Sequence, residues 1–361
     1  LAWVGWAFYS TQSDSIAFSE KELVGLQYTR EVFPVLAAAQ QLRRDTAAAI
    51  VDGSPPASLA QARSNLQSTR VKLAEVEKRL GTTLHTAAAF AAVQTALADT
   101  EKAADLQTVF TAHSKHIAAL IALLQTATDN SNLTLDPDID SYYLMDAALF
   151  RVPDILELSG KLRDLGRAVI LAGSATPEQQ QALNDVIPIA EYQLSTMAAS
   201  IAKAYAYAPN LSAKTNSKQT LDDTAALFAL ARGSVIRGKD VDIDKYMAAA
   251  NTAIDEQFAL VERLQSALQE VINARVQVMQ LKLLVTALVF VVFGSLAAYF
   301  FFSFYLVANG GLALISKHLG EVSTGDLRRF PNEPLGNDEP ARVLLDLRAT
   351  YDALHMLIRK V

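Results

Sequence analysis

The stretch "PEQQQALNDVIPIAEYQLSTMAASIAKAYAY" (residues 177–207) combines a marked helix start with a long amphipathic pattern. Thr176 precedes Pro177, and Gln179 stands three residues after the threonine. This is the pattern of a capping box with proline at the first helical position. The stretch is therefore predicted to be one long helix whose apolar face packs against other helices.

The remainder of residues 10–280 repeats this pattern. Amphipathic runs of about twenty to forty residues are separated by short segments rich in turn-forming residues. These segments are 51–58, 126–132, 171–177, 208–217 and 238–242. A second capping box is predicted at Ser58–Gln61. We expect an all-α protein with about six or seven helices in this region, arranged as an elongated antiparallel bundle. One long bundle and two stacked four-helix bundles both fit the length.

Residues 283–307 read "LLVTALVFVVFGSLAAYFFFSFYLV" and carry no charge. A helix of this length is about 37 Å long, enough to cross a hydrocarbon core of about 30 Å. It is predicted to be a transmembrane helix. Residues 1–9, "LAWVGWAFY", are too short to span but rich in aromatic side chains that favour the membrane interface. We interpret them as the outer end of a first transmembrane helix; a mature N-terminus left by signal-peptide cleavage is the alternative.

This interpretation places residues 10–280 on one side of the membrane and residues 308–361 on the other. Basic residues of short flanking segments favour the cytoplasmic side, and acidic residues count little in that rule. The tail contains several such residues: Lys317, Arg328, Arg329, Arg342, Arg348, Arg359 and Lys360. The tail is therefore predicted to be cytoplasmic, and the large helical segment extracytoplasmic.

Composition excludes several classes of function. The formal net charge is −6 and basic residues do not form a patch with aromatic ones, so no nucleic-acid partner is expected. The chain has no cysteine, which excludes disulfides, thiolate metal sites and cysteine nucleophiles. Phosphate-binding loops and hydrolase motifs are absent from the sequence. We therefore expect no enzyme activity, no metal and no cofactor.

The most distinctive polar stretch is "NLTLDPDIDSYYLMD" (residues 132–146). Asp136 before Pro137 fits an N-cap followed by a first-turn proline, and Asp138 and Asp140 would then lie in the first turn. The three aspartates also match the first ligand positions of an EF-hand loop. That loop would need glycine and glutamate where the chain has Ser141 and Ala147, so no calcium site is predicted.

A ligand pocket is the other interpretation of this stretch. Tyr142, Tyr143, Asp146 and Arg151 offer polar groups to a bundle interior and are the candidate ligand-binding residues. Tyrosines at helical spacing also occur as core residues with a satisfied hydroxyl, so capping with core packing remains the alternative. His113 and His116 lack carboxylates at metal-binding spacing and are predicted to lie on the surface.

The tail after the apolar stretch contains two heptad patterns. The first seam is Leu312, Ile315, Leu319 and Val322, and the second is Leu344, Leu347, Tyr351, Leu354 and Ile358. A linker with glycines and prolines separates them. Short seams of this kind must associate to bury their apolar faces, and a parallel homodimer with two helices per chain would bury both.

Helix, "GDL", linker, "DE" and helix, directly after a membrane span, resemble a HAMP domain in residues 308–361. The resemblance implies that Gly325, Asp326, Leu327, Asp338 and Glu339 take part in signal relay. Gly325 would let the chain leave the first helix, Leu327 would pack into the coiled coil, and Glu339 would start the second helix.

Upstream, "NLTLDPDIDSYYLMD" followed by "RVPDILE" resembles segments of bacterial methyl-accepting chemotaxis proteins and related sensor kinases. The resemblance implies a dimeric receptor in the bacterial inner membrane, most simply for chemotaxis. It would sense a small molecule or a periplasmic binding protein and signal to cytoplasmic partners through an output domain beyond Val361. A sensor histidine kinase or nucleotide cyclase with the same front half, and a non-signalling membrane scaffold, are the alternatives.

Overall fold

The computed structural model describes residues 2–235, 242–329, 331–334 and 336–360, and no strand occurs among them. These residues form two compact units. One comprises Phe8–Gln280, and the other comprises Leu1–Ala7 with Leu281–Val361. The predicted all-α fold is confirmed.

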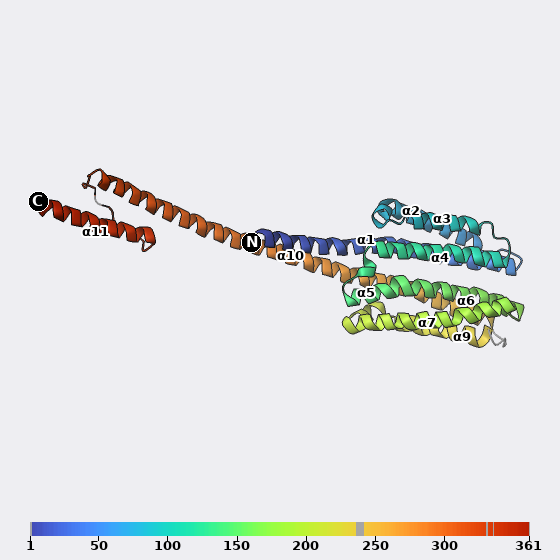
Figure 1. The fold of residues 1–361 in the computed structure, drawn as a ribbon. Coiled ribbons are helices and arrows are strands. Elements are labelled where there is room, and N and C mark those ends of the chain that lie inside the picture. The colour runs from blue at the N-terminus through green and yellow to red at the C-terminus, as the bar shows by residue number, and fades with distance from the viewer. Residues whose placement is uncertain (1, 236–241, 330, 335, 361) are drawn as a thin grey trace. The chain divides into compact units, whose positions relative to one another are not determined.

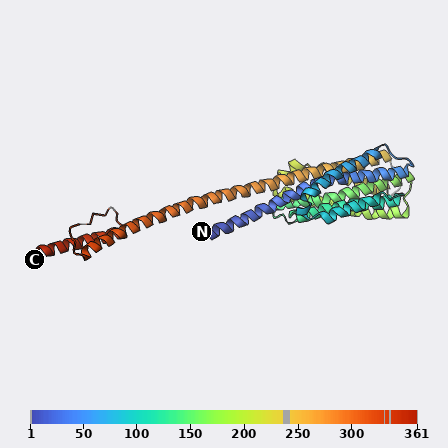
Figure 2. The same cartoon turned by 90° about the horizontal axis from the view of Figure 1, so that it is seen from above.

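The unit Phe8–Gln280 is a bundle of long helices (Figures 1 and 2). In chain order the helices are α1 (Ala2–Val51), α2 (Ser58–Leu84), α3 (Ala87–Thr100), α4 (Leu106–Asn130), α5 (Ile139–Met145), α6 (Val152–Ala172), α7 (Pro177–Tyr207), α8 (Leu211–Thr215), α9 (Lys218–Leu230) and α10 (Ile243–Ser323). In both views α4, α6 and α7 lie side by side rather than end to end. One hydrophobic cluster runs through these helices, so the unit is one long bundle with extra helices.

Helix boundaries follow local signals where those signals exist. Thr176 accepts a hydrogen bond from Gln179 N–H and receives the predicted capping box at the start of α7. The capping box predicted at Ser58 is wrong, because Ala57 is the N-cap of α2 and makes no side-chain cap bond. A break between α2 and α3 was not predicted. There His85 adopts a left-handed conformation (φ 50°) without glycine or proline nearby to mark it. The predicted break at 238–242 lies almost wholly outside the described residues.

Two irregular features shape α6 and its neighbours. A π-helical turn, Asp146–Arg151, joins α5 to α6 without interrupting the helical path. Such turns carry one extra residue and occur often at functional sites. Further along α6, a Cβ on Gly166 would lie 2.2 Å from the hydroxyl oxygen of Tyr246, a fully buried side chain of α10. Only glycine permits this close approach.

The second unit contains the end of α10 and α11 (Glu339–Lys360). The most apolar 18-residue window of α10 has a mean hydropathy of 2.4, and none of it is buried by protein. This helix is long and apolar enough to cross a membrane. Gly5 at the start of α1 lies beside this helix, because a Cβ there would be 3.6 Å from the Phe290 ring.

The C-terminal part of α10 packs on α11 within this unit. Ile315 is buried, together with Leu344, Leu347 and Tyr351. A Cβ on Gly311 would lie 2.5 Å from Pro340 Cβ, so glycine is required at this contact. Tyr351 also donates a hydrogen bond to the carbonyl of His318 at 3.2 Å. Leu312 and Leu319 of the first seam, in contrast, are exposed.

Candidate functional site

The polar stretch 132–146 folds differently from its predicted capped helix. A 3-10 turn (Leu133–Leu135) precedes Asp136, and α5 begins at Ile139 with Asp138 as its N-cap residue. The N-cap prediction for Asp136 is wrong. Its carboxylate accepts the backbone N–H of Asp138 at 2.9 Å and turns inward, where it is buried. The reason is a distant partner that local sequence does not reveal.

That partner is Arg275 of α10. Its Nη1 lies 2.7 Å from Asp136 Oδ1 and 2.9 Å from Asp138 Oδ2, and its Nη2 donates to Glu22 of α1. The side chains of Glu22 and Asp136 have no exposed surface. We call this group the arginine clamp: Arg275 with Glu22, Asp136 and Asp138. It ties α1, α10 and the segment before α5 together through one guanidinium.

Charges in the clamp do not balance, since three carboxylates face one arginine. Burial, and then the charge of Asp136, raise the pKa of Glu22 to about 7, although Arg275 opposes the shift. Burial opposes the charge of Arg275, but hydrogen bonding to Asp136 and the charges of Asp136 and Glu22 hold its pKa above its usual range. Glu22 therefore exchanges its proton near neutrality, at the point where α1 meets α10.

A cavity of about 350 Å³ adjoins the clamp. We call it the tyrosine cavity. Its lining residues are Asp136, Pro137, Asp138, Ile139, Tyr142, Tyr143, Lys203 and Tyr207. The rings of Tyr142 and Tyr143 meet edge to face at 5.3 Å, and Lys203 of α7 donates to the Tyr143 hydroxyl at 3.2 Å. Two aspartates of the clamp thus also form the wall of a cavity of ligand size.

The structure separates the four predicted ligand-binding residues. Tyr142 and Tyr143 line the tyrosine cavity, whereas Asp146 and Arg151 do not. Asp146 accepts hydrogen bonds from Arg151 at 3.2 Å and from Ser200 of α7 at 2.6 Å. Asp146 and Arg151 stand at the two ends of the π-helical turn, so their pairing holds that turn closed and fixes it to α7.

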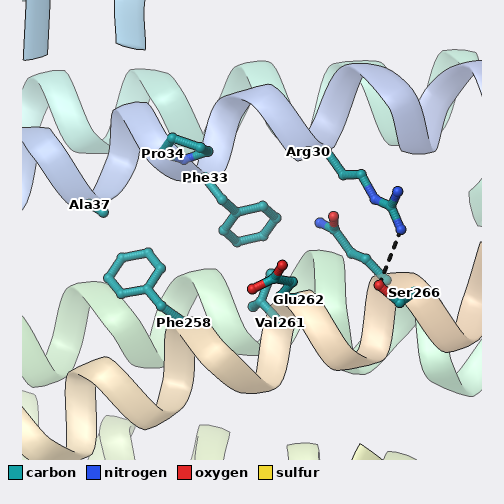
Figure 3. A pocket seen from close by; sticks show the side chains of 9 residues that line it. Arg30, Phe33, Pro34, Ala37, Phe258, Val261, Glu262 and Ser266 are labelled. Carbon is teal, nitrogen blue, oxygen red and sulfur yellow. Dashed lines mark hydrogen bonds between the residues drawn. The ribbon is translucent and has the colours of Figure 1, made fainter. Parts of the chain in front are cut away.

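A larger groove of about 450 Å³ lies between α1 and α10 (Figure 3). Phe33 of α1 and Phe258 of α10 point into it, and Arg30 donates to Ser266 across it at 3.4 Å. The groove is open and mostly apolar in its lining, and sequence analysis did not single out any of these residues.

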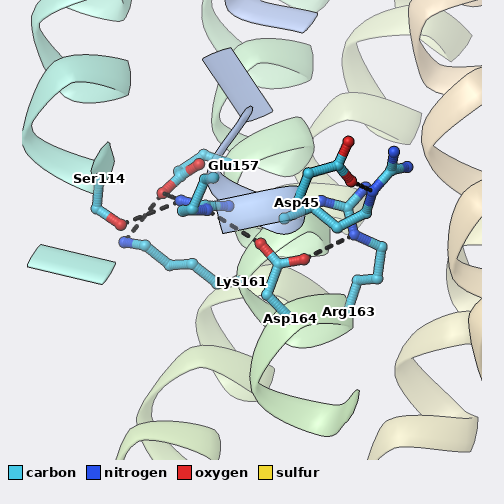
Figure 4. A network of polar contacts seen from close by, with 8 residues as sticks. Asp45, Ser114, Glu157, Lys161, Arg163 and Asp164 are labelled. Atoms are coloured by element: carbon cyan, nitrogen blue, oxygen red, sulfur yellow. Dashed lines mark hydrogen bonds and ion pairs between the residues drawn. The ribbon is translucent and has the colours of Figure 1, made fainter. Parts of the chain in front are cut away.

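A buried ionic network connects α1 with α6 (Figure 4). Arg43, which is fully buried, pairs with Glu157 at 2.7 Å and Asp164 at 3.0 Å and donates to Ser114 of α4 at 3.0 Å. Burial alone would lower the pKa of Arg43, but the two carboxylates raise it. The only signal in the sequence is that Glu157 and Asp164 are seven residues apart, on one face of an otherwise apolar helix.

The prediction that His113 and His116 lie on the surface is wrong. Both are buried in α4, with 2% and 1% of their surface exposed. Burial lowers the pKa of both imidazoles to about 4; Arg43 adds to the shift at His113, and His113 and Arg70 add to it at His116. They are therefore neutral core residues. No group of acidic or histidine residues suited to a metal ion occurs in the described part of the chain.

The predicted relay residues occupy the ends of the helices in the second unit. Gly325 has φ +74° and donates to the carbonyl of Val322, while Asp326 donates to that of Glu321. These two bonds form a Schellman cap that ends α10. Asp338 accepts from Ala341 N–H at 2.9 Å, and α11 begins at Glu339 as expected. Leu327 is half-buried.

Comparison with known proteins shows a likeness of fold alone. No family model matches the chain, and no curated protein matches it either. Among solved structures, the chain is similar to the structure of the NasR transcription antiterminator, with a TM-score of 0.53 and 13% identity. The similarity covers 98% of this chain and 99% of that chain. At this identity the likeness carries no inference about activity.

Proposed function

We propose that the chain is a homodimeric transmembrane receptor of the bacterial inner membrane that binds and relays a signal without catalysis. The arginine clamp is the observation that carries this proposal. Arg275 pairs with carboxylates from α1 and from the wall of the tyrosine cavity. Eight residues further along α10, the charge-free stretch 283–307 begins.

In this proposal the tyrosine cavity receives the ligand, a small molecule or a segment of a periplasmic binding protein. Tyr142 and Tyr143 contact it, and Asp136 and Asp138 respond to it. A ligand that favours one arrangement of these aspartates shifts the clamp by its differential affinity for the two arrangements and by no more than that. Because Arg275 belongs to α10, the shift acts directly on the helix that continues into the apolar stretch.

Residues 308–361 relay the signal in the cytoplasm as a HAMP-type parallel coiled coil. The exposed Leu312 and Leu319 support pairing with a second copy, since one chain buries only part of the first seam. The helix ends at Gly325 and Asp338 support a defined turn between the two helices. The paired coil then acts on cytoplasmic signalling partners, as in chemotaxis or in a sensor kinase or cyclase.

Transcription antitermination is the function named for the structural neighbour. An RNA-binding antiterminator would need a basic surface, whereas this chain carries a net charge of −6 and an exposed apolar stretch in α10. These two features favour a membrane receptor.

Labelling of single cysteines in intact cells tests the proposal, because the chain has no cysteine of its own. Ser64→Cys and Asp352→Cys place thiols at exposed positions on either side of the apolar stretch. A membrane-impermeant maleimide should label Ser64→Cys and spare Asp352→Cys until the cells are opened. Equal labelling of the two variants in intact cells would refute a transmembrane receptor.

A further inference from the structure

A third cavity, of about 330 Å³, lies among α4, α6 and α7, apart from the tyrosine cavity. We call it the carboxylate cavity. Its lining residues are Ser114, Ala118, Ile121, Ala122, Gln125, Asp154, Glu157, Leu158, Lys161, Ile189 and Gln193. Alanine, isoleucine and leucine form one part of the wall. Two carboxylates one helical turn apart on α6 form another.

Glu157 is the first of these carboxylates and is only 8% exposed. Its Oε1 is occupied by Arg43 at 2.7 Å and by Lys161 at 3.5 Å. Its Oε2 is buried and has no hydrogen-bond partner among the residues that the structure describes. A buried carboxylate oxygen without a donor is costly, and native proteins usually satisfy such an atom. The orphaned oxygen indicates that a donor from outside the chain belongs here.

Asp154 is the second carboxylate. Its Oδ2 accepts one hydrogen bond, from Gln193 of α7 at 3.2 Å. Burial raises the pKa of Asp154, and the nearby Arg151 only partly offsets this effect. A cation placed beside Asp154 would therefore restore the ionised carboxylate that burial disfavours.

We propose that the carboxylate cavity binds a small primary amine with a short apolar chain. The ammonium group donates to Glu157 Oε2 and to Asp154, with Gln125 and Gln193 as further polar neighbours. The hydrocarbon chain lies against Ile121, Leu158 and Ile189. An ammonium group supplies three donors and the charge that both carboxylates require, which neither an alcohol nor a carboxylic acid offers.

Binding of this amine also reaches α1. Glu157 is the residue through which the cavity touches the buried Arg43, and Arg43 bonds Ser114 of α4 as well (Figure 4). The amine thus neutralises one oxygen of a carboxylate whose other oxygen holds α1 against α6. The site deepens the proposed receptor function by naming a ligand class for its helical bundle, but the binding step itself does not depend on signalling.

Isothermal titration calorimetry on the full chain in lipid nanodiscs tests the proposal with n-butylammonium as the probe. We expect saturable binding of one n-butylammonium per chain, with n-butanol and butyrate binding at least about tenfold more weakly. Absence of saturable n-butylammonium binding would overturn the proposal. Equal binding of n-butanol would overturn it too, because the carboxylates would then play no part.

Two variants locate the site independently of each other. Asp154→Asn removes one charge from a half-buried position and should weaken n-butylammonium binding about tenfold or more. Ala122→Leu fills the cavity from an exposed position of α4 and should weaken it at least as much while leaving both carboxylates in place. Ala199→Leu, an exposed alanine of α7 outside the lining, is the matched control and should bind as the parent does. Parent-like affinity in both cavity variants would overturn the assignment.

This test and the labelling test fail separately. Butylammonium can bind a chain with any topology, and the labelling of Ser64→Cys and Asp352→Cys does not depend on an amine.

Discussion

Arg275 Nη1 lies 2.7 Å from Asp136 Oδ1, and this ion pair joins two residues 139 positions apart in the chain. It connects the wall of a cavity to the helix that contains the apolar stretch. Breaking a buried pair by removing one partner is costly, because the remaining charge stays buried without compensation. The clamp is therefore both a structural tie and the site where a ligand would act on α10.

Asp136→Asn should lower the free energy of unfolding by about 3 kcal/mol. Asparagine keeps the shape and the acceptor for Asp138 N–H, but it removes the charge that faces Arg275. Thermal unfolding of the full chain in detergent, followed by circular dichroism, measures the effect. Asp138→Asn is the matched control, because the Asp138 side chain is 52% exposed and should contribute less than about 1 kcal/mol. Equal losses in both variants would contradict the buried role of Asp136.

His113 and His116 should destabilise the bundle as the pH falls. Their folded pKa values of about 4 lie below the ordinary value of 6.5, so the unfolded chain binds more protons between these limits. The stability that they contribute is fully present above about pH 6.5 and is lost as the pH falls toward 4. The slope should reach about 1.4 kcal/mol per pH unit for each histidine.

The pH dependence of thermal unfolding checks this, with His116→Leu as the test variant. It should flatten the profile between pH 6.5 and 4, whereas His85→Asn, at an exposed position, should leave it unchanged. A parent-like profile in His116→Leu would show that His116 is not a buried neutral group.

Glu22 should act in the opposite direction over a similar range. Its pKa is raised from 4.5 to about 7, chiefly by burial, so the folded chain binds the extra proton. The stability from this group is present below about pH 4.5 and is lost as the pH rises through about 7. Glu22→Gln cannot ionise and should therefore gain stability relative to the parent as the pH rises from 4.5 to 7. A difference between variant and parent that does not change with pH would rule out this titration.

Gly166→Ala should lower the free energy of unfolding by about 1–3 kcal/mol. Its Cβ would overlap the Tyr246 phenol, whose hydroxyl donates to the carbonyl of Leu162 at 2.6 Å. Gly320→Ala is the control, because a Cβ there meets nothing within 4 Å and alanine favours the helix by about 0.5–1 kcal/mol. Melting temperatures should therefore move in opposite directions in the two variants.

Leu319→Cys should form disulfide cross-links between two copies in membranes, since residues of a heptad seam meet their counterparts in a parallel coiled coil. Leu319 is 51% exposed in a single chain, which leaves it available to a partner. Lys317→Cys, on another side of the same helix, should cross-link much less. The yield of dimer on non-reducing gels gives the answer, and equal yields would argue against a homodimer through the first seam.

Sequence patterns predicted the features that depend on neighbouring residues. The capped start at Thr176, the apolar stretch 283–307 and the helix start at Glu339 are each specified by a few adjacent side chains. The roles of Asp136 and Arg43 could not be predicted in this way. Asp136 before Pro137 has the local pattern of an N-cap, and only a distant arginine decides that it turns inward.

The candidate site shows the same division. Tyr142 and Tyr143 line a cavity, as the ligand interpretation expects, but Lys203 and Tyr207 come from a helix about sixty residues later. Asp146 and Arg151 looked equivalent to the tyrosines in the sequence. The π-helical turn between them directs their side chains toward each other and toward Ser200 instead.

The π-helical turn has a consequence for chain length in this region. It accommodates one more residue than ordinary α-helical winding would, and so it sets the rotational phase of everything that follows in α6. Deleting a single residue from Asp146–Arg151 would rotate Glu157 and Asp164 by about 100° around the helix axis. Arg43 would then be left facing apolar side chains, so this turn tolerates replacement of its residues far better than loss of one.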